Sequence, residues 1–340
     1  MLFYPSHDIA LANGVRHFNP PAMAKHLQED LAYLSDIWNE PYRRGEVSMP
    51  IPWGWDYDTR LWIHRQYRIA LADLPNDEDL RLIRSLSSRQ TTITLCEEIG
   101  RRFPTLGVQT PRYLTNEQEV MEFIAAHDAT GKPFVLKTPW SSSGRGLTLS
   151  HVRDKAGATI PFDRQKMLTH ALSTLRKMGG IMGEEWIVGK QQDFAILFYA
   201  DKERVRFIGY SLFDNDDTLG GVTYRQGYLR SNDDILSMLG ADRQLMQALA
   251  SAYEEILTRL LAPLLGKAWP LGYLGIDMLT YSTPENGSKD SVCIAPCIEM
   301  NLRATMGTVC RLWWEKHRQD GLYRVSEMQA DGHFTAEFIC

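Results

Sequence analysis

One stretch, Pro133 to Ser150, constrains the fold more than any other part of the chain. Its sequence, PFVLKTPWSSSGRGLTLS, predicts an apolar strand, a lysine at Lys137, a loop of small residues and a second strand over Leu147 to Leu149. Such a loop exposes backbone N–H groups and carries little side-chain bulk, so a phosphate group can approach the main chain. It is not a Walker loop, because no Gly-Lys-Ser/Thr sequence follows the glycines. The same residues also fit a flexible hairpin turn with a solvated arginine.

Composition excludes several classes of protein. The chain has 340 residues, 44% of them hydrophobic and 23% charged, which is typical of a globular protein. A net charge of −5 argues against a dedicated nucleic-acid binder. We find no apolar run long enough for a transmembrane helix, no signal peptide, and no cysteine spacing typical of zinc sites among the five cysteines. We therefore expect a cytoplasmic protein with reduced thiols and with neither nucleic-acid nor membrane partners.

Hydrophobic periodicity predicts a mixture of helices and strands. A helix is expected after Asn19, with Pro20 and Pro21 in its first turn and apolar residues at Met23, Leu27, Leu31 and Leu34. Further helices are expected at 77–86, 89–102, 116–127, 162–178, 242–265 and 308–318. Strands are expected at 107–115, 181–188, 193–201, 204–214, 221–229, 273–281 and 292–300. The order of elements in the second half of the chain therefore predicts an antiparallel sheet rather than regular βαβ alternation. The last twenty residues are ambiguous, and the aromatic residues Trp53, Trp55, Tyr57 and Trp62 could line a pocket or, as aromatics more often do, pack in a core.

Acidic residues mark the end of the strand predicted at 181–188. Glu184-Glu185-Trp186-Ile187 is followed by Gly189 and then Asp193. A strand end of this kind offers backbone groups and an apolar wall to a flat ring, and a carboxylate beyond it could accept hydrogen bonds from ribose hydroxyls. Acidic residues at strand ends are, however, often only solvated.

A third polar set lies on the hairpin predicted at 273–300. Glu299 and Asn301 are two residues apart on one strand and point to the same side, and Asp277 can face them from the neighbouring strand. Two carboxylates and an amide oxygen are ligands suited to Mg²⁺, which retains waters and shares nucleotide phosphates. The same residues would also fit a surface hairpin with solvated acids.

Five motifs over about residues 87–315 resemble, in their order, those of the ATP-grasp superfamily. They are the lysine strand, SSSGRG, EEWI with the following G and DF, GIDM and EMNLRATMG. Among its branches, the chain resembles the D-alanine ligase-like and carboxylate–amine ligases. The resemblance implies an α+β / α/β chain in which two α+β subdomains, 87–187 and 188–340, grip ATP. It further implies a small α/β N-terminal domain over 1–86 that shapes a substrate pocket.

The resemblance also implies the nucleotide-binding residues. They are Arg89, Lys137, Ser142, Ser143, Gly144, Arg145, Gly146, Glu184, Glu185, Ile187 and Asp193. Lys137 would contact the α- and β-phosphates, and the loop would close over the β- and γ-phosphates. Arg89 stands where the family commonly has a second phosphate lysine, and arginine can still grip phosphate. Glu184 would face the adenine amino group, with the hinge backbone at Glu185 and Ile187. Asp193 would hold the ribose, where the family usually has glutamate and where Gln192 competes.

By the same resemblance, Asp277, Glu299 and Asn301 would hold two Mg²⁺ ions. The catalytic residues would be Lys137 and Arg303, and Arg303 would steady an acyl-phosphate or a substrate carboxylate. Gly275 stands where D-alanine ligases often carry an arginine, so the chain departs from them there.

The implied activity is an ATP-dependent ligase that activates a carboxylate as an acyl-phosphate and couples it to an amine, releasing ADP and phosphate. A phosphotransferase of the same fold and a non-catalytic nucleotide-binding module are the alternatives. Arg206, Arg225 and Arg230, together with Arg303, suggest an anionic acceptor such as an amino acid or peptide, although the first three could be solvated charges at strand edges.

Overall fold

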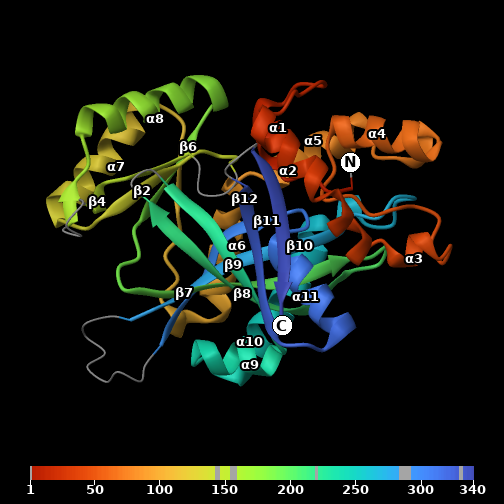
Figure 1. The fold of residues 1–340 in the computed structure, drawn as a ribbon. Helices are drawn as coiled ribbons and strands as arrows, with labels where there is room; N and C mark the ends of the chain where they lie inside the picture. The colour runs from red at the N-terminus through yellow and green to blue at the C-terminus, as the bar shows by residue number, and fades with distance from the viewer. Residues whose placement is uncertain (1, 142–145, 154–158, 219–220, 283–291, 329–331) are drawn as a thin grey trace.

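Two antiparallel sheets organise the chain (Figure 1). The computed structural model describes residues 2–141, 146–153, 159–218, 221–282, 292–328 and 332–340. The smaller sheet has the order β1 (Arg112–Leu114), β6 (Ile181–Glu185), β2 (Phe134–Lys137) and β3 (Leu147–Leu149). The larger sheet has the order β11 (Cys293–Asn301), β10 (Gly272–Tyr281), β7 (Lys190–Ala200), β8 (Val205–Thr218), β9 (Gly221–Leu229), β12 (Gly321–Met328) and β13 (His333–Ile339). β4 (His151–Arg153) and β5 (Thr159–Pro161) form a separate hairpin.

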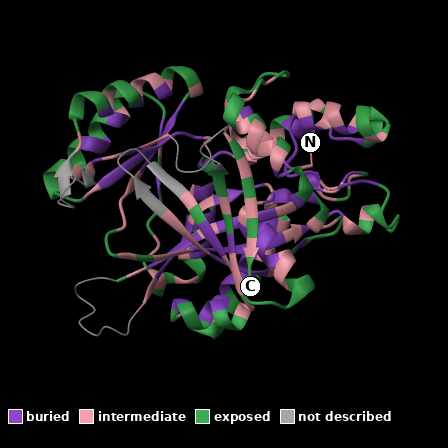
Figure 2. Ribbon diagram, in the orientation of Figure 1, coloured by how far each residue is buried: buried purple, intermediate pink, exposed green. Residues whose placement is uncertain are grey.

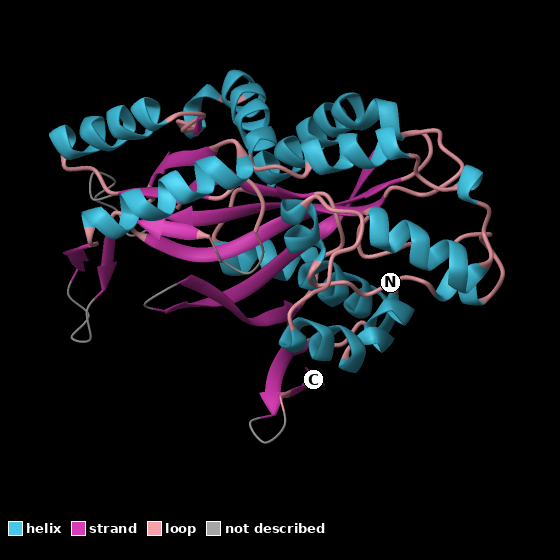
Figure 3. Ribbon diagram, turned by 90° about the horizontal axis from the view of Figure 1, so that it is seen from above, coloured by secondary structure: helices cyan, strands magenta, loops and turns pink. Residues whose placement is uncertain are grey.

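Helices lie on both sides of these strands when the molecule is seen from above (Figure 3). They are α1 (His7–Asn13), α2 (Ala22–Asp30), α3 (Glu40–Arg43), α4 (Tyr57–Tyr67), α5 (Asp77–Leu86), α6 (Gln90–Arg102), α7 (Glu117–Thr130), α8 (Arg164–Met178), α9 (Asn232–Leu239), α10 (Arg243–Leu261) and α11 (Met306–His317). Short 3-10 turns occupy Ala32–Ile37, Leu71–Asp73, Pro104–Leu106 and Ala262–Leu264. The α+β class is confirmed, and so are the helices expected from the sequence, including the N-terminal one, which is α2. Their ends differ from the expected ends by a few residues.

The smaller sheet is covered by α7 and α8, which lie beside β2 and β6 in Figure 1. Asn116 caps α7 by accepting a hydrogen bond from the backbone of Glu119, and Gly179 ends α8 in the left-handed conformation. Phe123 of α7 packs against Phe134 of β2 at a ring separation of 5.5 Å. These two helices and the strands beneath them thus have a hydrophobic core of their own.

The larger sheet buries one face against α6 and α10. Phe194, Ile196 and Phe198 alternate along β7 and all enter this core, as the predicted alternation requires. Phe198 meets Tyr253 of α10 at a ring separation of 6.2 Å. Figure 2 shows buried positions concentrated along these strands and exposed positions on the outer helices. The opposite face of the sheet packs against α11 and the N-terminal helices.

The N-terminal segment differs from the expectation. Residues 2–86 contain helices and turns but no strand, so the α/β character predicted for this segment is wrong. Its large side chains enter the cores of the larger sheet rather than a core of their own. Trp53 packs in one cluster with Tyr323, and Trp55 in the other, where its indole N–H donates to the carbonyl of Pro270 at 2.7 Å. These tryptophans therefore pack in the cores instead of lining a pocket. Within the described ranges, no helix has the length and apolar character needed to cross a membrane.

Candidate functional site

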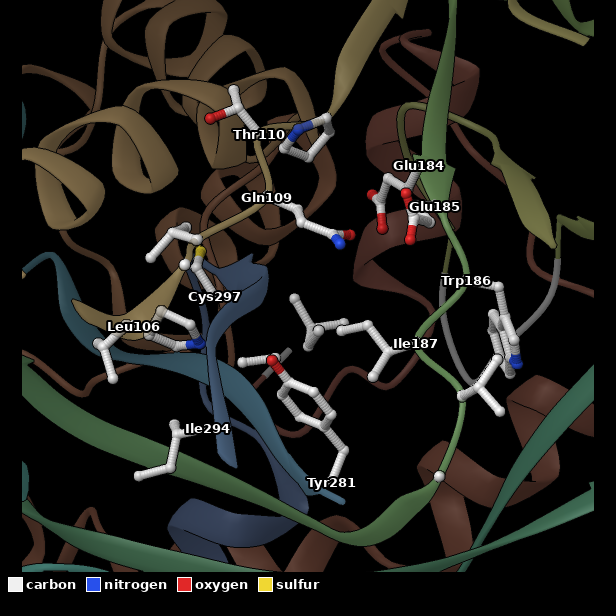
Figure 4. A pocket seen from close by; sticks show the side chains of 18 of the residues that line it. Leu106, Gln109, Thr110, Glu184, Glu185, Trp186, Ile187, Tyr281, Ile294 and Cys297 are labelled. Carbon is white, nitrogen blue, oxygen red and sulfur yellow. The ribbon is translucent and has the colours of Figure 1, made fainter. Parts of the chain in front are cut away.

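A cavity of about 640 Å³ lies where the two sheets meet (Figure 4). One wall is the segment 184–189, which leads from β6 of the smaller sheet to β7 of the larger. The other walls are 106–111 before β1, the end of β10, and 294–298 on β11. This volume lies within the range of roughly 300–1,000 Å³ typical of small-molecule sites. The strand end that the sequence marked as a hinge is therefore the link between the sheets.

Apolar and polar side chains occupy different sides of this cavity. Ile187, Tyr281 and Ile294 form an apolar side, while Gln109 extends toward Glu184 in Figure 4. The turn into β7 depends on Gly189, whose φ is 80° and whose added Cβ would lie 2.4 Å from the carbonyl oxygen of Ser282. Only glycine fits there without moving the backbone.

Lys137 and Glu184 meet between neighbouring strands of the smaller sheet. The ammonium group of Lys137 forms an ion pair with Oε2 of Glu184, and Lys137 is only 6% exposed. The second oxygen of Glu184, Oε1, is buried and has no hydrogen-bond partner among the described residues. A buried acceptor without a donor is costly, so a donor group placed in the cavity would be stabilised there. Glu185 instead pairs with Lys132 at 2.9 Å on a more exposed side.

Arg89 connects the two sheets. This buried arginine precedes α6 and donates to the carbonyl of Thr138 at 2.7 Å and to the hydroxyl of Ser141 at 2.8 Å. Its other terminal nitrogen donates to Oε2 of Glu299 on β11 at 2.7 Å. A single guanidinium thus links the base of the Gly/Ser loop to a carboxylate of the larger sheet.

The loop itself is only partly described. Ser142, Ser143, Gly144 and Arg145 lie outside the described residues. Gly146 has a φ of 73°, and an added Cβ would lie 2.4 Å from the hydroxyl of Thr138. The backbone N–H of Thr138 donates to the carbonyl of Gly146 at 3.0 Å. The end of the loop is therefore held beside Lys137.

Two carboxylates face each other on the larger sheet. Asp277 of β10 lies opposite Glu299 of β11, and the side-chain amide of Asn301 donates to Asp277 at 2.9 Å. Burial and the nearby charge of Glu299 raise the pKa of Asp277 to about 7. No group of three or more His, Cys, Asp or Glu residues suited to a metal occurs in the described part of the chain. The set of two repelling carboxylates and an amide nonetheless fits Mg²⁺, which proteins often bind through one or two carboxylates and substrate phosphates.

Asp193 and Gln192 point to opposite faces of β7. Asp193 pairs with Leu279 and lies two positions from Ala195, the partner of Asp277, so Asp193 and Asp277 share one face. Asp193 accepts hydrogen bonds from Lys190 and Asn215, each at 3.0 Å. Between the two candidates, Asp193 is therefore the one on the carboxylate side of the sheet.

Arg303 lies just beyond β11 and is paired with Asp8 of α1. Its Nε donates to the two carboxylate oxygens of Asp8 at 3.0 and 2.8 Å. The Arg303 guanidinium holds the pKa of Asp8 well below its usual range, despite burial. The other arginines considered from the sequence have partners nearby, since Arg206 pairs with Asp201 and Arg225 with Asp214.

Comparisons with known proteins begin with two negative results, since no family model and no curated protein matches the sequence. Several solved structures do match. An ADP complex of N5-carboxyaminoimidazole ribonucleotide synthetase is 16% identical, with a TM-score of 0.38 over 74% of this chain and 52% of that one. The synthetase from Thermus thermophilus is 16% identical, with a TM-score of 0.42 over 79% and 69%.

A third match is the biotin carboxylase domain of 2-oxoglutarate carboxylase from Hydrogenobacter thermophilus, crystallised with MgADP and bicarbonate. It is 11% identical, with a TM-score of 0.45 over 92% of this chain and 64% of that one. The chain spans about half the length of the first of these structures. At this distance, the likeness carries no conclusion about activity or substrate.

The arrangement within the chain decides the fold. Two antiparallel sheets, joined by the link at 186–189, border one cavity. Lys137 pairs with Glu184 within the smaller sheet, and Arg89, just before α6, pairs with Glu299 of the larger sheet. This is the two-sheet arrangement that the resemblance of the sequence motifs to the ATP-grasp superfamily implies. The smaller sheet carries Lys137 and the larger sheet carries Asp277 and Glu299.

Sequence reasoning missed several residues of the cavity and its surroundings. Gln109 and Thr110 line the cavity, yet in the sequence they are only part of a short predicted strand. Tyr281 and Cys297 carry no motif signal. Asp8 stands in the first turn of a seven-residue helix, and its partner Arg303 is 295 positions away, so no local pattern announces the contact.

Proposed function

We propose that the chain is an ATP-dependent ligase that activates a carboxylate as an acyl-phosphate and couples it to an amine. The observation that carries the proposal is the contact of Arg89 with Glu299 at 2.7 Å. It brings a cation suited to phosphate to a candidate metal carboxylate. Ile298, the neighbour of Glu299, and Glu184, the partner of Lys137, both line the cavity. A cation and a carboxylate that meet close to a cavity of this size suit a magnesium nucleotide.

The cavity is suited to the base of ATP. Ile187, Tyr281 and Ile294 offer an apolar surface to a flat ring, and the unpartnered oxygen of Glu184 can accept a hydrogen bond from an exocyclic amino group. The phosphates would then extend toward Lys137 and Arg89, which can both donate charge-assisted hydrogen bonds. We propose that Asp193 accepts hydrogen bonds from the ribose hydroxyls.

Asp277, Glu299 and Asn301 are the residues that would hold Mg²⁺. When bound, this ion would neutralise charge on the phosphate oxygens during transfer. A nearby cation would also favour the ionised form of Asp277, whose pKa is raised by burial and by Glu299. A cation bound between Asp277 and Glu299 would thus stabilise the state in which both carboxylates are ionised.

The proposed reaction has two steps. A substrate carboxylate attacks the γ-phosphate of ATP to give an acyl-phosphate and ADP, and an amine then attacks the carbonyl carbon and displaces phosphate. The chain would align the reactants and exclude water, with Arg303 donating to the oxygens of the intermediate. An amino acid or peptide as the acceptor stays a prediction from the sequence.

Nucleotide binding is the first test. A non-hydrolysable ATP analogue would be titrated by calorimetry with and without Mg²⁺ into the wild type, Lys137→Ala and Glu299→Gln. We expect Mg²⁺-dependent binding that each change weakens by at least about tenfold, the loss of one charge-assisted contact. Lys166→Ala and Glu255→Gln are matched controls, because both side chains are exposed and lie outside the site. A folded wild-type protein that binds no analogue would refute the proposal.

Product analysis then separates the ligase from its rivals. Phosphate release would be measured with pairs drawn from amino acids, dipeptides, bicarbonate and simple amines. A ligase requires both the carboxylate and the amine for phosphate release. Formation of a stable phosphorylated acceptor without an amine would identify a phosphotransferase, and binding without turnover for any pair would favour a non-catalytic module.

A further inference from the structure

Arg303 is held from one side by a residue of the N-terminal segment. Its Nε donates to the carboxylate of Asp8, to Oδ1 at 3.0 Å and to Oδ2 at 2.8 Å, and Nη2 forms an ion pair with Oδ2 at 2.5 Å. A third donor, on Nη1, is used by the carbonyl of Ala304 at 3.0 Å. Both side chains of the pair are mostly buried, with exposed fractions of 14% and 13%. The guanidinium therefore has one fixed orientation.

This pairing leaves part of the guanidinium unused. An arginine has five N–H donors, and the contacts above use one on each of its three nitrogens. One N–H on each terminal nitrogen remains, with no other partner in the described part of the chain. Arg303 lies two residues beyond Asn301, and Glu299 and Asp277 are near enough to act on it electrostatically. The unused donors therefore belong to the neighbourhood of the proposed phosphoryl transfer.

The helix that carries Asp8 is itself held in place. Its neighbour His7 is fully buried, and Nε2 of His7 donates to the carbonyl of Trp55 at 3.2 Å. An added Cβ on Gly54 would lie 2.7 Å from that ring, so the backbone closes tightly over it. Ala10 is buried on the same helix. Asp8 can thus act as a rigid support for another side chain.

We propose that Asp8 is a positioning residue that orients Arg303 so that its two remaining N–H groups bind the oxygens of the transferred phosphoryl group. The inference rests on the proposed function and deepens it, because it makes α1 of the N-terminal segment a part of the active site. The ordinary alternative is that Asp8 only neutralises a buried arginine. That role would affect stability but not the affinity for an oxyanion.

The test uses inorganic phosphate as the probe, titrated by calorimetry into the full chain saturated with MgADP. We expect Asp8→Asn to weaken phosphate binding about tenfold, because a side-on charged pair becomes a single neutral contact. MgADP affinity should stay within about twofold of the wild type, since Asp8 does not reach the cavity. Asp128→Asn is the control, because it removes the carboxylate from another two-point Asp–Arg pair, the exposed Asp128–Arg164 pair.

A double-mutant cycle distinguishes positioning from an independent effect. If Asp8 acts through Arg303, Asp8→Asn should add little to the loss caused by Arg303→Lys, which cannot form the same fork. Fully additive losses, or a phosphate affinity that Asp8→Asn leaves unchanged while MgADP still binds, would overturn this inference alone. A wild type that binds no MgADP would overturn the proposed function and this inference together.

Discussion

Replacing Asp277 by asparagine removes one of the two carboxylates that face each other on β10 and β11. Burial and Glu299 raise the pKa of Asp277 from 3.8 to about 7. Each unit of pKa shift corresponds to about 1.4 kcal/mol, so keeping Asp277 ionised costs the folded state roughly 4 kcal/mol. Because the side chain is partly exposed, this figure is an upper limit. Asparagine has a similar shape and carries no such cost.

The sign of the effect follows from proton binding. Between about pH 4 and about pH 7, folded Asp277 keeps a proton that the unfolded chain has lost, so the free energy of unfolding falls as pH rises through this window. The Asp277→Asn protein lacks this dependence. We therefore expect it to match the wild type near about pH 4 and to exceed its stability by up to roughly 4 kcal/mol at about pH 8.

Urea unfolding across this pH range, in buffer containing a chelator, measures the difference. Adding Mg²⁺ with ADP should then stabilise the wild type but not Asp277→Asn, because ligands that bind only the folded state raise its stability. Asp233→Asn, at a carboxylate with 74% of its side chain exposed, is the control and should follow the wild type. Parallel pH profiles for wild type and Asp277→Asn, or a less stable variant at about pH 8, would refute the reasoning.

Three further predictions concern packing and the loop. Gly146→Ala places a Cβ against Thr138 at a positive φ, and calorimetry should show weaker ATP-analogue binding, by about tenfold. Glu184→Gln leaves the buried ammonium of Lys137 without its charge partner, and urea unfolding should show a loss of about 3–5 kcal/mol. Ile63→Ala should cost about 2–5 kcal/mol in a single unfolding transition, because α4 shares the core of the larger sheet. A separate N-terminal transition would contradict that last prediction, and Ile63→Val, at about 0.5–1.5 kcal/mol, is its matched control.

Local patterns in the sequence determined most of the elements and the faces that they present. The α5 helix begins at a capping box formed by Asn76 and Asp79, so its start could be predicted from neighbouring residues alone. Asp277 and Glu299 face each other because side chains alternate along strands and the two strands form one antiparallel hairpin. Such features depend on residues close in sequence, or on a single hairpin pairing.

The hairpin of β12 and β13 shows where this reasoning fails. Its residues, 321–339, alternate weakly and are ambiguous in the sequence, yet β12 pairs with β9 at Tyr323 opposite Gly227. Backbone hydrogen bonding to an existing sheet edge, together with the burial of Tyr323, decides this pairing. Neither is visible in the segment itself.

Only the tertiary structure decided which surfaces meet. Arg89 reaches Glu299 across 210 positions, and Asp8 reaches Arg303 across 295. The N-terminal tryptophans were expected in a small α/β domain, but Trp55 is buried with Trp269 in the core of the larger sheet. Hydrophobic burial is non-directional, and an ion pair depends on the distance in space and not on the separation in sequence. The partners of these side chains therefore depend on how the helices and strands pack together. The sequence determined the chemistry that each element carries, and packing determined which groups share one site.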